Sequence, residues 1–253
     1  MKLNTNSNVY TIIYSTIVVV IVAVILAFVN QTLKPLQDKN ELLDKQKQIL
    51  GALKVDFAGQ DPAKVYESII ATGDTMIFFK PNTTDTVRVF KAHLYDGTLK
   101  YVLPLSGKGL WGGIGGYLVL NEDKDEIYGV NFNHESETPG LGAKIVDMEF
   151  REKFEGKHIH NAAGMPAPVA VLKAGKKGEN GQDVVDAISG ATITSSGVST
   201  MLKENLEGYQ WFLENKSTVN PASVEAVRKG LQDALLEYMN DLNKEVQDVE
   251  SED

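Results

Sequence analysis

The chain has 253 residues, which is enough for one membrane segment and one globular domain with a hydrophobic core. It contains no cysteine, and this excludes disulfides, thiolate metal sites and cysteine-ligated iron–sulfur clusters. Its formal net charge of -9 argues against nucleic acid as a partner, because the phosphates would repel an acidic protein.

A short segment, residues 1–9, precedes an apolar run that contains no charge, proline or glycine. At about 1.5 Å per residue, a helix over residues 10–29 spans the roughly 30 Å hydrocarbon core of a bilayer. A cleaved signal peptide and a buried core helix are the alternatives. The following residues offer no small-residue cleavage site and the run has no polar face, so we predict one transmembrane helix in membrane lipid.

The lysines on the two sides of this helix are unequal in number. Only Lys2 precedes the helix, whereas Lys34, Lys39, Lys45 and Lys47 follow it. The positive-inside rule alone would keep the following domain in the cytoplasm, but the rule is weak for long translocated domains. The residue pattern therefore leaves the orientation open.

Residues 30–56 read as a juxtamembrane helix or linker, because apolar and polar residues recur at helical spacing. The next part, residues 57–217, has the pattern of one α+β domain with an antiparallel sheet. Two hairpins are predicted over residues 90–105, around an Asp-Gly turn, and over 115–133. We further expect a helix over 144–154, a strand over 167–175 and a helix from about residue 198.

The C-terminal segment, residues 218–253, is predicted to form an amphipathic helix with an acidic tail. Its apolar stripe packs on its own domain or against a partner helix. The stripe consists of Val224, Val227, Leu231, Leu235, Met239, Leu242 and Val246.

The most informative run is DAISGAT, residues 186–192, which is followed by ITSSG at 193–197. Small residues let the backbone approach a ligand closely, and a helix N-terminus attracts anions through its free N–H groups and its dipole. The run is therefore suited to a phosphate. The alternative is that its hydroxyl groups only cap the helix.

This run is similar to the recognition sequence of flavin transferases, which move FMN from FAD onto the hydroxyl of the final threonine. The resemblance implies that Thr192 carries FMN covalently through a phosphoester. It also implies that the preceding residues line the cofactor, namely Asp186, Ser189, Gly190 and Ala191.

A second run, ETPGLG at residues 137–142, is a turn with one proline and two glycines, and on its own it could be a plain connection between elements. It resembles the loop that lies against the flavin ring in the same proteins and offers backbone groups to the ring edges. The resemblance adds Glu137, Thr138, Gly140 and Leu141 to the expected cofactor-binding residues. His134 lies one residue further from this run than usual, and its role stays open.

The third run is rich in glycine, residues 107–116, and does not match a P-loop because no Gly-Lys-Ser/Thr follows. A mobile loop or a tight strand corner is expected. Trp111 in this run either covers a flavin or anchors the loop in the core. His158 and His160 lack a third ligand at metal spacing and are expected on the surface.

Together the predicted anchor, GKGLWG, ETPGLG and DAISGAT resemble the C subunit of the sodium-pumping NADH:quinone reductases, in the same order along residues 1–215. The G subunit of the Rnf complex, which links ferredoxin and NAD, shares three of these four features. GKGLWG and the chain length favour the quinone reductase. A non-redox anchored protein for binding or structure is the alternative from another class.

The resemblance implies an electron-transfer subunit of a bacterial inner-membrane complex, with its FMN domain on the periplasmic side. The implied partners are the other subunits of that complex, membrane lipid and the flavin transferase. A flavin can exchange electrons one at a time with carriers on other subunits. The protein is then expected to supply geometry and tuning rather than catalytic acid–base residues.

Overall fold

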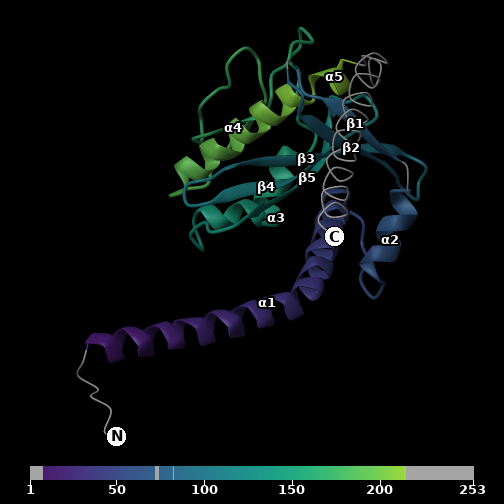
Figure 1. The fold of residues 1–253 in the computed structure, drawn as a ribbon. Coiled ribbons are helices and arrows are strands. Elements are labelled where there is room, and N and C mark those ends of the chain that lie inside the picture. Colours follow the sequence, from purple (N-terminus) through teal and green to yellow (C-terminus); the bar gives the residue numbers. More distant parts are fainter. Residues whose placement is uncertain (1–7, 72–73, 82, 215–253) are drawn as a thin grey trace, which may run out of the picture.

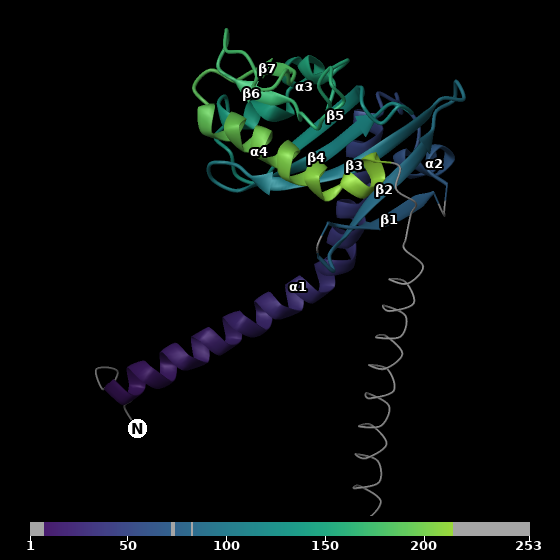
Figure 2. The same cartoon turned by 90° about the horizontal axis from the view of Figure 1, so that it is seen from above.

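A computed structural model describes residues 8–71, 74–81 and 83–214. The first element, α1 (Asn8–Ala52), is a single helix that projects from the domain (Figures 1 and 2). Its apolar N-terminal part has a mean hydropathy of 3.1 and is not buried by the rest of the described chain. Its last turn is different, because Ile49, Leu50 and Ala52 are buried against the domain.

The centre of the domain is one antiparallel sheet whose strands follow the chain order without a crossover. Each strand pairs with the next through a short connection, so the sheet is a meander. The strands are β1 (Thr75–Phe79), β2 (Thr86–His93), β3 (Leu99–Lys108), β4 (Gly113–Leu120) and β5 (Ile127–His134). The α+β class with an antiparallel sheet is confirmed.

Alternation along the strands gives the sheet two buried faces. Leu103 and Leu118 belong to the larger core on one face, whereas their neighbours Val102 and Val119 belong to the smaller core on the other. This follows from the period of two that places successive strand side chains on opposite faces. The end of α1 and α2 (Pro62–Ile69) cover the smaller core.

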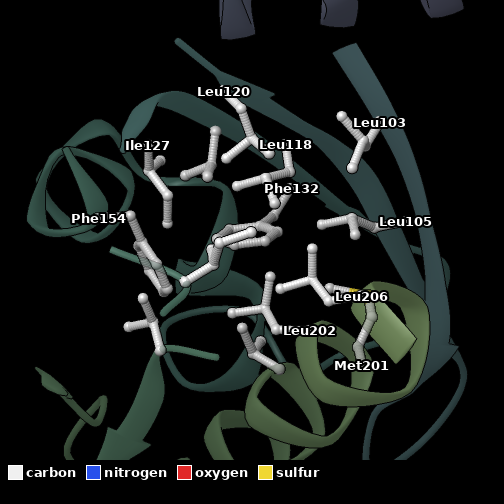
Figure 3. Close-up of a cluster of buried hydrophobic side chains, with 14 of the residues drawn as sticks. Leu103, Leu105, Leu118, Leu120, Ile127, Phe132, Phe154, Met201, Leu202 and Leu206 are labelled. Atoms are coloured by element: carbon white, nitrogen blue, oxygen red, sulfur yellow. The ribbon is translucent and has the colours of Figure 1, made fainter. Parts of the chain in front are cut away.

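Helix α4 (Thr192–Gly208) covers the larger core and is followed by α5 (Gln210–Leu213). Figure 3 shows Met201, Leu202 and Leu206 of α4 directed toward side chains of β3, β4 and β5. The Asn205 side chain also pairs with the backbone of Ser106, donating to its carbonyl at 2.8 Å and accepting from its N–H at 3.3 Å. Strand β2 pairs only with residues 99–102 of β3. Asn205 therefore makes hydrogen bonds to a part of β3 that β2 leaves unpaired.

Small elements connect β5 to α4. These are η1 (Gly142–Val146), α3 (Met148–Arg151), η2 (Glu152–Phe154), β6 (Ala170–Leu172) and β7 (Val184–Asp186). Strands β6 and β7 form a separate parallel pair. Aromatic side chains from β5, α3 and η2 pack against one another, with Phe132 and Phe154 edge to face at 5.2 Å between ring centroids.

Most predicted elements agree with this fold. Both hairpins are confirmed, and Gly97 in the first turn has a φ of 81°. The single helix predicted over residues 144–154 is wrong, because Asp147 adopts an extended backbone and divides the stretch into short turns. The predicted C-terminal helix at 218–253 lies outside the described residues.

Candidate functional site

The three runs identified in the sequence meet at one end of the sheet. GKGLWG forms the turn between β3 and β4, ETPGLG connects β5 to η1, and SGAT leads into α4. The glycine-rich run forms a tight strand corner, which was one of the two expectations. The Gly109 N–H donates to the carbonyl of Gly112 at 2.9 Å and closes this corner. Segments far apart in the chain therefore converge.

Glu137 joins the three segments. Its side chain is 4% exposed. One carboxylate oxygen accepts the N–H of Trp111 at 2.8 Å, and the other accepts the hydroxyl of Thr194 at 2.6 Å. The Glu137 N–H donates to Nδ1 of His134 at 3.3 Å, so this histidine contacts the backbone at the start of the ETPGLG loop.

Glycines let the backbone close around this carboxylate. A Cβ atom at Gly109 would collide with one oxygen of Glu137, and a Cβ atom at Gly142 would collide with the other. At Gly142 it would also lie 2.6 Å from the hydroxyl oxygen of Thr194. One glycine in each of two runs, Gly109 and Gly142, thus leaves room for the same buried side chain.

The carboxylate of Glu137 is held in its ionised form. Burial raises its pKa, but the hydrogen bond from Thr194 and those from the backbone of Trp111, Leu110 and Gly112 outweigh burial and lower the pKa below its usual value. Donors that converge on a buried carboxylate stabilise the charged form more than the neutral form.

Thr192 is the first residue of α4 and its side chain is exposed. The residue at the cap position is Ala191, which has no side-chain hydrogen-bond acceptor, so the capping alternative is wrong for this helix. The first bond of the helix runs from Ser195 N–H to the carbonyl of Ala191 at 2.9 Å. The preceding N–H groups of the first turn have no protein acceptor among the described residues, and such groups attract anions at helix N-termini.

Two other hydroxyl groups of the run, those of Thr194 and Ser195, have internal partners. Thr194 bonds Glu137, and the Ser195 hydroxyl accepts the N–H of Ile188 at 3.1 Å. Both side chains are buried. Gly190 has a φ of 77° and packs against Leu141, so the SGAT turn contacts the ETPGLG loop directly. The motifs do not single out Thr194, because its partner lies 57 residues away along the chain.

The ETPGLG loop presents exposed residues beside the SGAT turn. The carbonyl of Thr138 accepts the N–H groups of Leu141 and Ala143, both at 3.1 Å, which closes the loop on itself. Thr138, Pro139 and Gly140 are exposed, and Gly140 has a φ of 77°. Such a φ favours glycine, and the loop has little bulk on its outer side.

Each of the three segments also exposes a large apolar side chain. Trp111 is 68% exposed, Leu141 is 42% exposed and Ile193 is 60% exposed. The expectation that Trp111 could anchor the loop in the core is therefore wrong. Apolar side chains beside an uncapped helix N-terminus suit a ligand with a flat ring and an anionic end.

A pocket of about 180 Å³ adjoins the SGAT turn. Ser189 lines it together with two lysines, Lys144 and Lys153, and two acidic residues, Asp147 and Glu149. The Lys153 ammonium lies 4.0 Å from the Glu149 carboxylate, so the pocket carries both signs of charge. Sequence reasoning missed these two lysines and considered Lys176 and Lys177, which lie in the loop between β6 and β7. No motif marks Lys144 or Lys153, because folding alone brings them to Ser189.

The histidines at 158 and 160 have acidic partners away from this site. His158 lies 3.4 Å from Asp183 and is exposed, as expected. The same expectation is wrong for His160, which is partly buried and bonds Asp125 through Nδ1 at 2.8 Å. Asp125 lies in the turn between β4 and β5, so this pair fixes the following segment to the sheet.

Comparison with known proteins identifies the same region. The family model described as FMN-binding domain matches residues 109–207, from the corner between β3 and β4 to the end of α4. The C subunit of the Na(+)-translocating NADH-quinone reductase of Neisseria meningitidis serogroup B is 30% identical over 221 residues, which are 72% of this chain and 81% of that protein.

Two solved structures share the fold. The C subunit of the Na(+)-translocating NADH-quinone reductase from Parabacteroides distasonis has a TM-score of 0.65 and 38% identity, and the match covers 74% of this chain and 98% of that one. NqrC of Shewanella oneidensis has a TM-score of 0.59 and 26% identity, with 71% and 97% covered. The chain therefore belongs to the NqrC family, the C subunits of Na(+)-translocating NADH-quinone reductases, and contains its FMN-binding domain.

Proposed function

We propose that the protein is the electron-transfer subunit of a membrane sodium-translocating NADH:quinone reductase and carries FMN on Thr192 through a phosphoester. The observation that carries this proposal is the position of Thr192. Its side chain is exposed at an uncapped helix N-terminus, where the other two runs also converge. FMN is the cofactor in this proposal because the chain belongs to this family and contains its FMN-binding domain.

The attachment is a group transfer from FAD. The hydroxyl oxygen of Thr192 bonds to the phosphorus on the flavin side of the FAD diphosphate, and the bond to the bridging oxygen breaks. AMP leaves and the hydroxyl proton is released, so no oxidant or reductant is needed. A flavin transferase is the partner for this step, and an exposed Thr192 is open to such an enzyme.

The residues near Thr192 fit FMN. The N–H groups of the first turn of α4 favour the phosphate. The exposed ETPGLG loop and the side chains of Trp111 and Ile193 suit the ring. FMN itself supplies reversible electron transfer when bound.

The apolar helix α1 and the family support the location that we propose. Residues 10–29 span the inner membrane, 30–56 connect the span to the domain, 57–217 form the FMN domain on the periplasmic side, and 218–253 follow it. The remaining subunits of the complex are then the electron donor and acceptor. The described part of the chain has one helix long and apolar enough for a span.

In-gel fluorescence tests the attachment. The full chain, produced together with a flavin transferase, is expected to give a fluorescent band under ultraviolet light after denaturing electrophoresis. Thr192→Ala should abolish the fluorescence, because no hydroxyl is left to form the phosphoester. Thr200→Ala is the matched control, since Thr200 is an exposed threonine in the same helix and should leave the band unchanged.

Two results would contradict the proposal. A dark wild-type band would favour the non-redox anchored protein. Fluorescence that persists in Thr192→Ala would place the attachment at another residue.

A further inference from the structure

We propose that Glu137 is a positioning residue for the flavin site, and that its carboxylate holds the Thr192 turn and the ETPGLG loop in one fixed arrangement. This inference rests on the proposed function, because it concerns how the same site is built. Glu137 was expected to bind the cofactor itself, and its contacts point to a different role.

Both oxygens of the Glu137 carboxylate are taken by protein donors. One accepts the N–H of Trp111, 26 residues earlier in the chain, and the other accepts the hydroxyl of Thr194, 57 residues later. At 2.8 and 2.6 Å these are short hydrogen bonds to a charged acceptor, which are among the stronger ones in proteins. Two segments distant in sequence are thus joined through one side chain.

The surroundings keep the carboxylate in this place. The backbone of Gly109 approaches one oxygen and that of Gly142 approaches the other, with no space for a side chain at either position. The side chain is 4% exposed, so it is enclosed by protein rather than directed outward to a ligand. Glu135 is the contrast, because it is exposed and accepts the N–H of Gly113 at 3.1 Å.

The two partners of Glu137 are coupled to the exposed groups of the site. Thr194 is in the first turn of α4, two residues after Thr192, so its position sets that of the Thr192 backbone. The Trp111 N–H belongs to the same residue as the exposed indole ring. Loss of the carboxylate would release the corner between β3 and β4 from the start of α4, and thus let both ends of the site move.

Hydrogen–deuterium exchange of the full chain in detergent tests this link without any cofactor. In Glu137→Ala, the amide of Trp111 should exchange about tenfold faster than in the wild type, because it loses its acceptor. Glu135→Ala is the matched control and should leave the Trp111 amide unchanged. Thr194→Val removes one partner with little change of volume, and it keeps the test usable if Glu137→Ala fails to fold.

The FMN-loaded protein tests the effect on the site. The circular dichroism of the flavin in visible light reports its surroundings, and it should change in Glu137→Ala and in Thr194→Val. Glu137→Gln should restore the wild-type signal, because its amide oxygen can accept from Trp111 and its amide NH2 can donate to Thr194. A merely structural role would lower stability and leave this signal unchanged.

The possible outcomes separate the two proposals. Suppose that the wild-type band is fluorescent. If neither the flavin signal nor the exchange rate of the Trp111 amide then changes in Glu137→Ala, the positioning role alone is overturned. A flavin signal in Glu137→Gln that matches Glu137→Ala would overturn it as well, since charge rather than geometry would then matter. A dark wild-type band would overturn the covalent attachment, and the exchange experiment would still decide the role of Glu137.

Discussion

Glu137 also makes the stability of the domain depend on pH. Its pKa in the folded protein is lower than the usual value of 4.5, because hydrogen bonds from Thr194 and the backbone outweigh the effect of burial. A lowered pKa means that the ionised group stabilises the fold above pH 4.5, and that this contribution is lost as the pH falls through the lower, folded pKa. The charge at this one residue therefore contributes to stability at neutral pH.

The residue-scale prediction compares Glu137→Gln with the wild type. Glutamine can keep both hydrogen bonds but not the charge, so we expect the free energy of unfolding to fall by about 1 kcal/mol at neutral pH. The deficit should shrink when the pH is lowered below the usual pKa of 4.5, because the lowered pKa of Glu137 then contributes less to the stability of the wild type. Urea unfolding at neutral pH and at the lower pH measures it, with Glu135→Gln as the exposed control. A deficit that does not change with pH would show that the lowered pKa is not its cause.

At the scale of elements, the position of α4 depends on a close approach to the sheet. A Cβ atom at Gly197 would lie 2.5 Å from the carbonyl oxygen of Lys108, at the end of β3. Because backbone rather than a flexible side chain is in the way, the helix or the strand would have to move. The same helix begins at Thr192, so its distance from β3 sets the geometry of the site.

We therefore expect Gly197→Ala to lower the free energy of unfolding by about 1–3 kcal/mol, the usual cost of an overpacked contact. Gly208→Ala in the same helix is the matched control, since the nearest atom to its Cβ would be in the flexible Lys80 side chain at 3.6 Å. Alanine favours a helix over glycine by up to about 1 kcal/mol, so the control should be neutral or stabilising. Equal effects in thermal unfolding of the two variants would contradict the close-approach argument.

The elements that sequence reasoning predicted are those with a local cause. Alternating side chains and an Asp-Gly turn mark the hairpin of β2 and β3 without reference to the rest of the chain. The stretch 144–154 has helical spacing, but the extended backbone of Asp147 divides it, and no local signal shows this. The residue pattern of the sequence also did not predict α2, β1 or β7, which are short and packed by tertiary contacts.

The candidate site shows the same division. Thr192 and the ETPGLG loop were found through resemblance, because their motifs are contiguous in the chain. The link between Glu137 and Thr194 joins residues 57 apart, and the pocket between Lys153 and Ser189 joins two separate turns. Such contacts exist only after folding, and a single sequence does not contain them.

At the scale of the whole molecule, α1 joins two environments. Its N-terminal part exposes apolar side chains along the apolar run, while its last turn belongs to the domain core. The hydroxyl of Thr16 donates to the carbonyl of Ile12 at 2.8 Å, which satisfies a polar group that lipid cannot. The fold of the helix is therefore compatible with a bilayer around its first part.

The last prediction concerns the side of the membrane on which the domain lies. Four lysines after the span would place it in the cytoplasm by the positive-inside rule, whereas we propose the periplasm from the family resemblance. The chain has no cysteine, so a single introduced cysteine reports the position of one residue. Lys176→Cys reports on the domain because Lys176 is exposed, and Thr5→Cys reports on the segment before the span.

A maleimide reagent that cannot cross the inner membrane should label Lys176→Cys in intact spheroplasts, because the domain would face the reagent directly. Thr5→Cys should be labelled only after the membrane is permeabilised, since its segment would face the cytoplasm. The wild type controls for background labelling, and fluorescence of the FMN band in each variant shows that the domain has folded. The reverse labelling pattern would put the domain in the cytoplasm. The lysines after the span would then determine the orientation, and a flavin transferase acting on Thr192 would have to work on the cytoplasmic side.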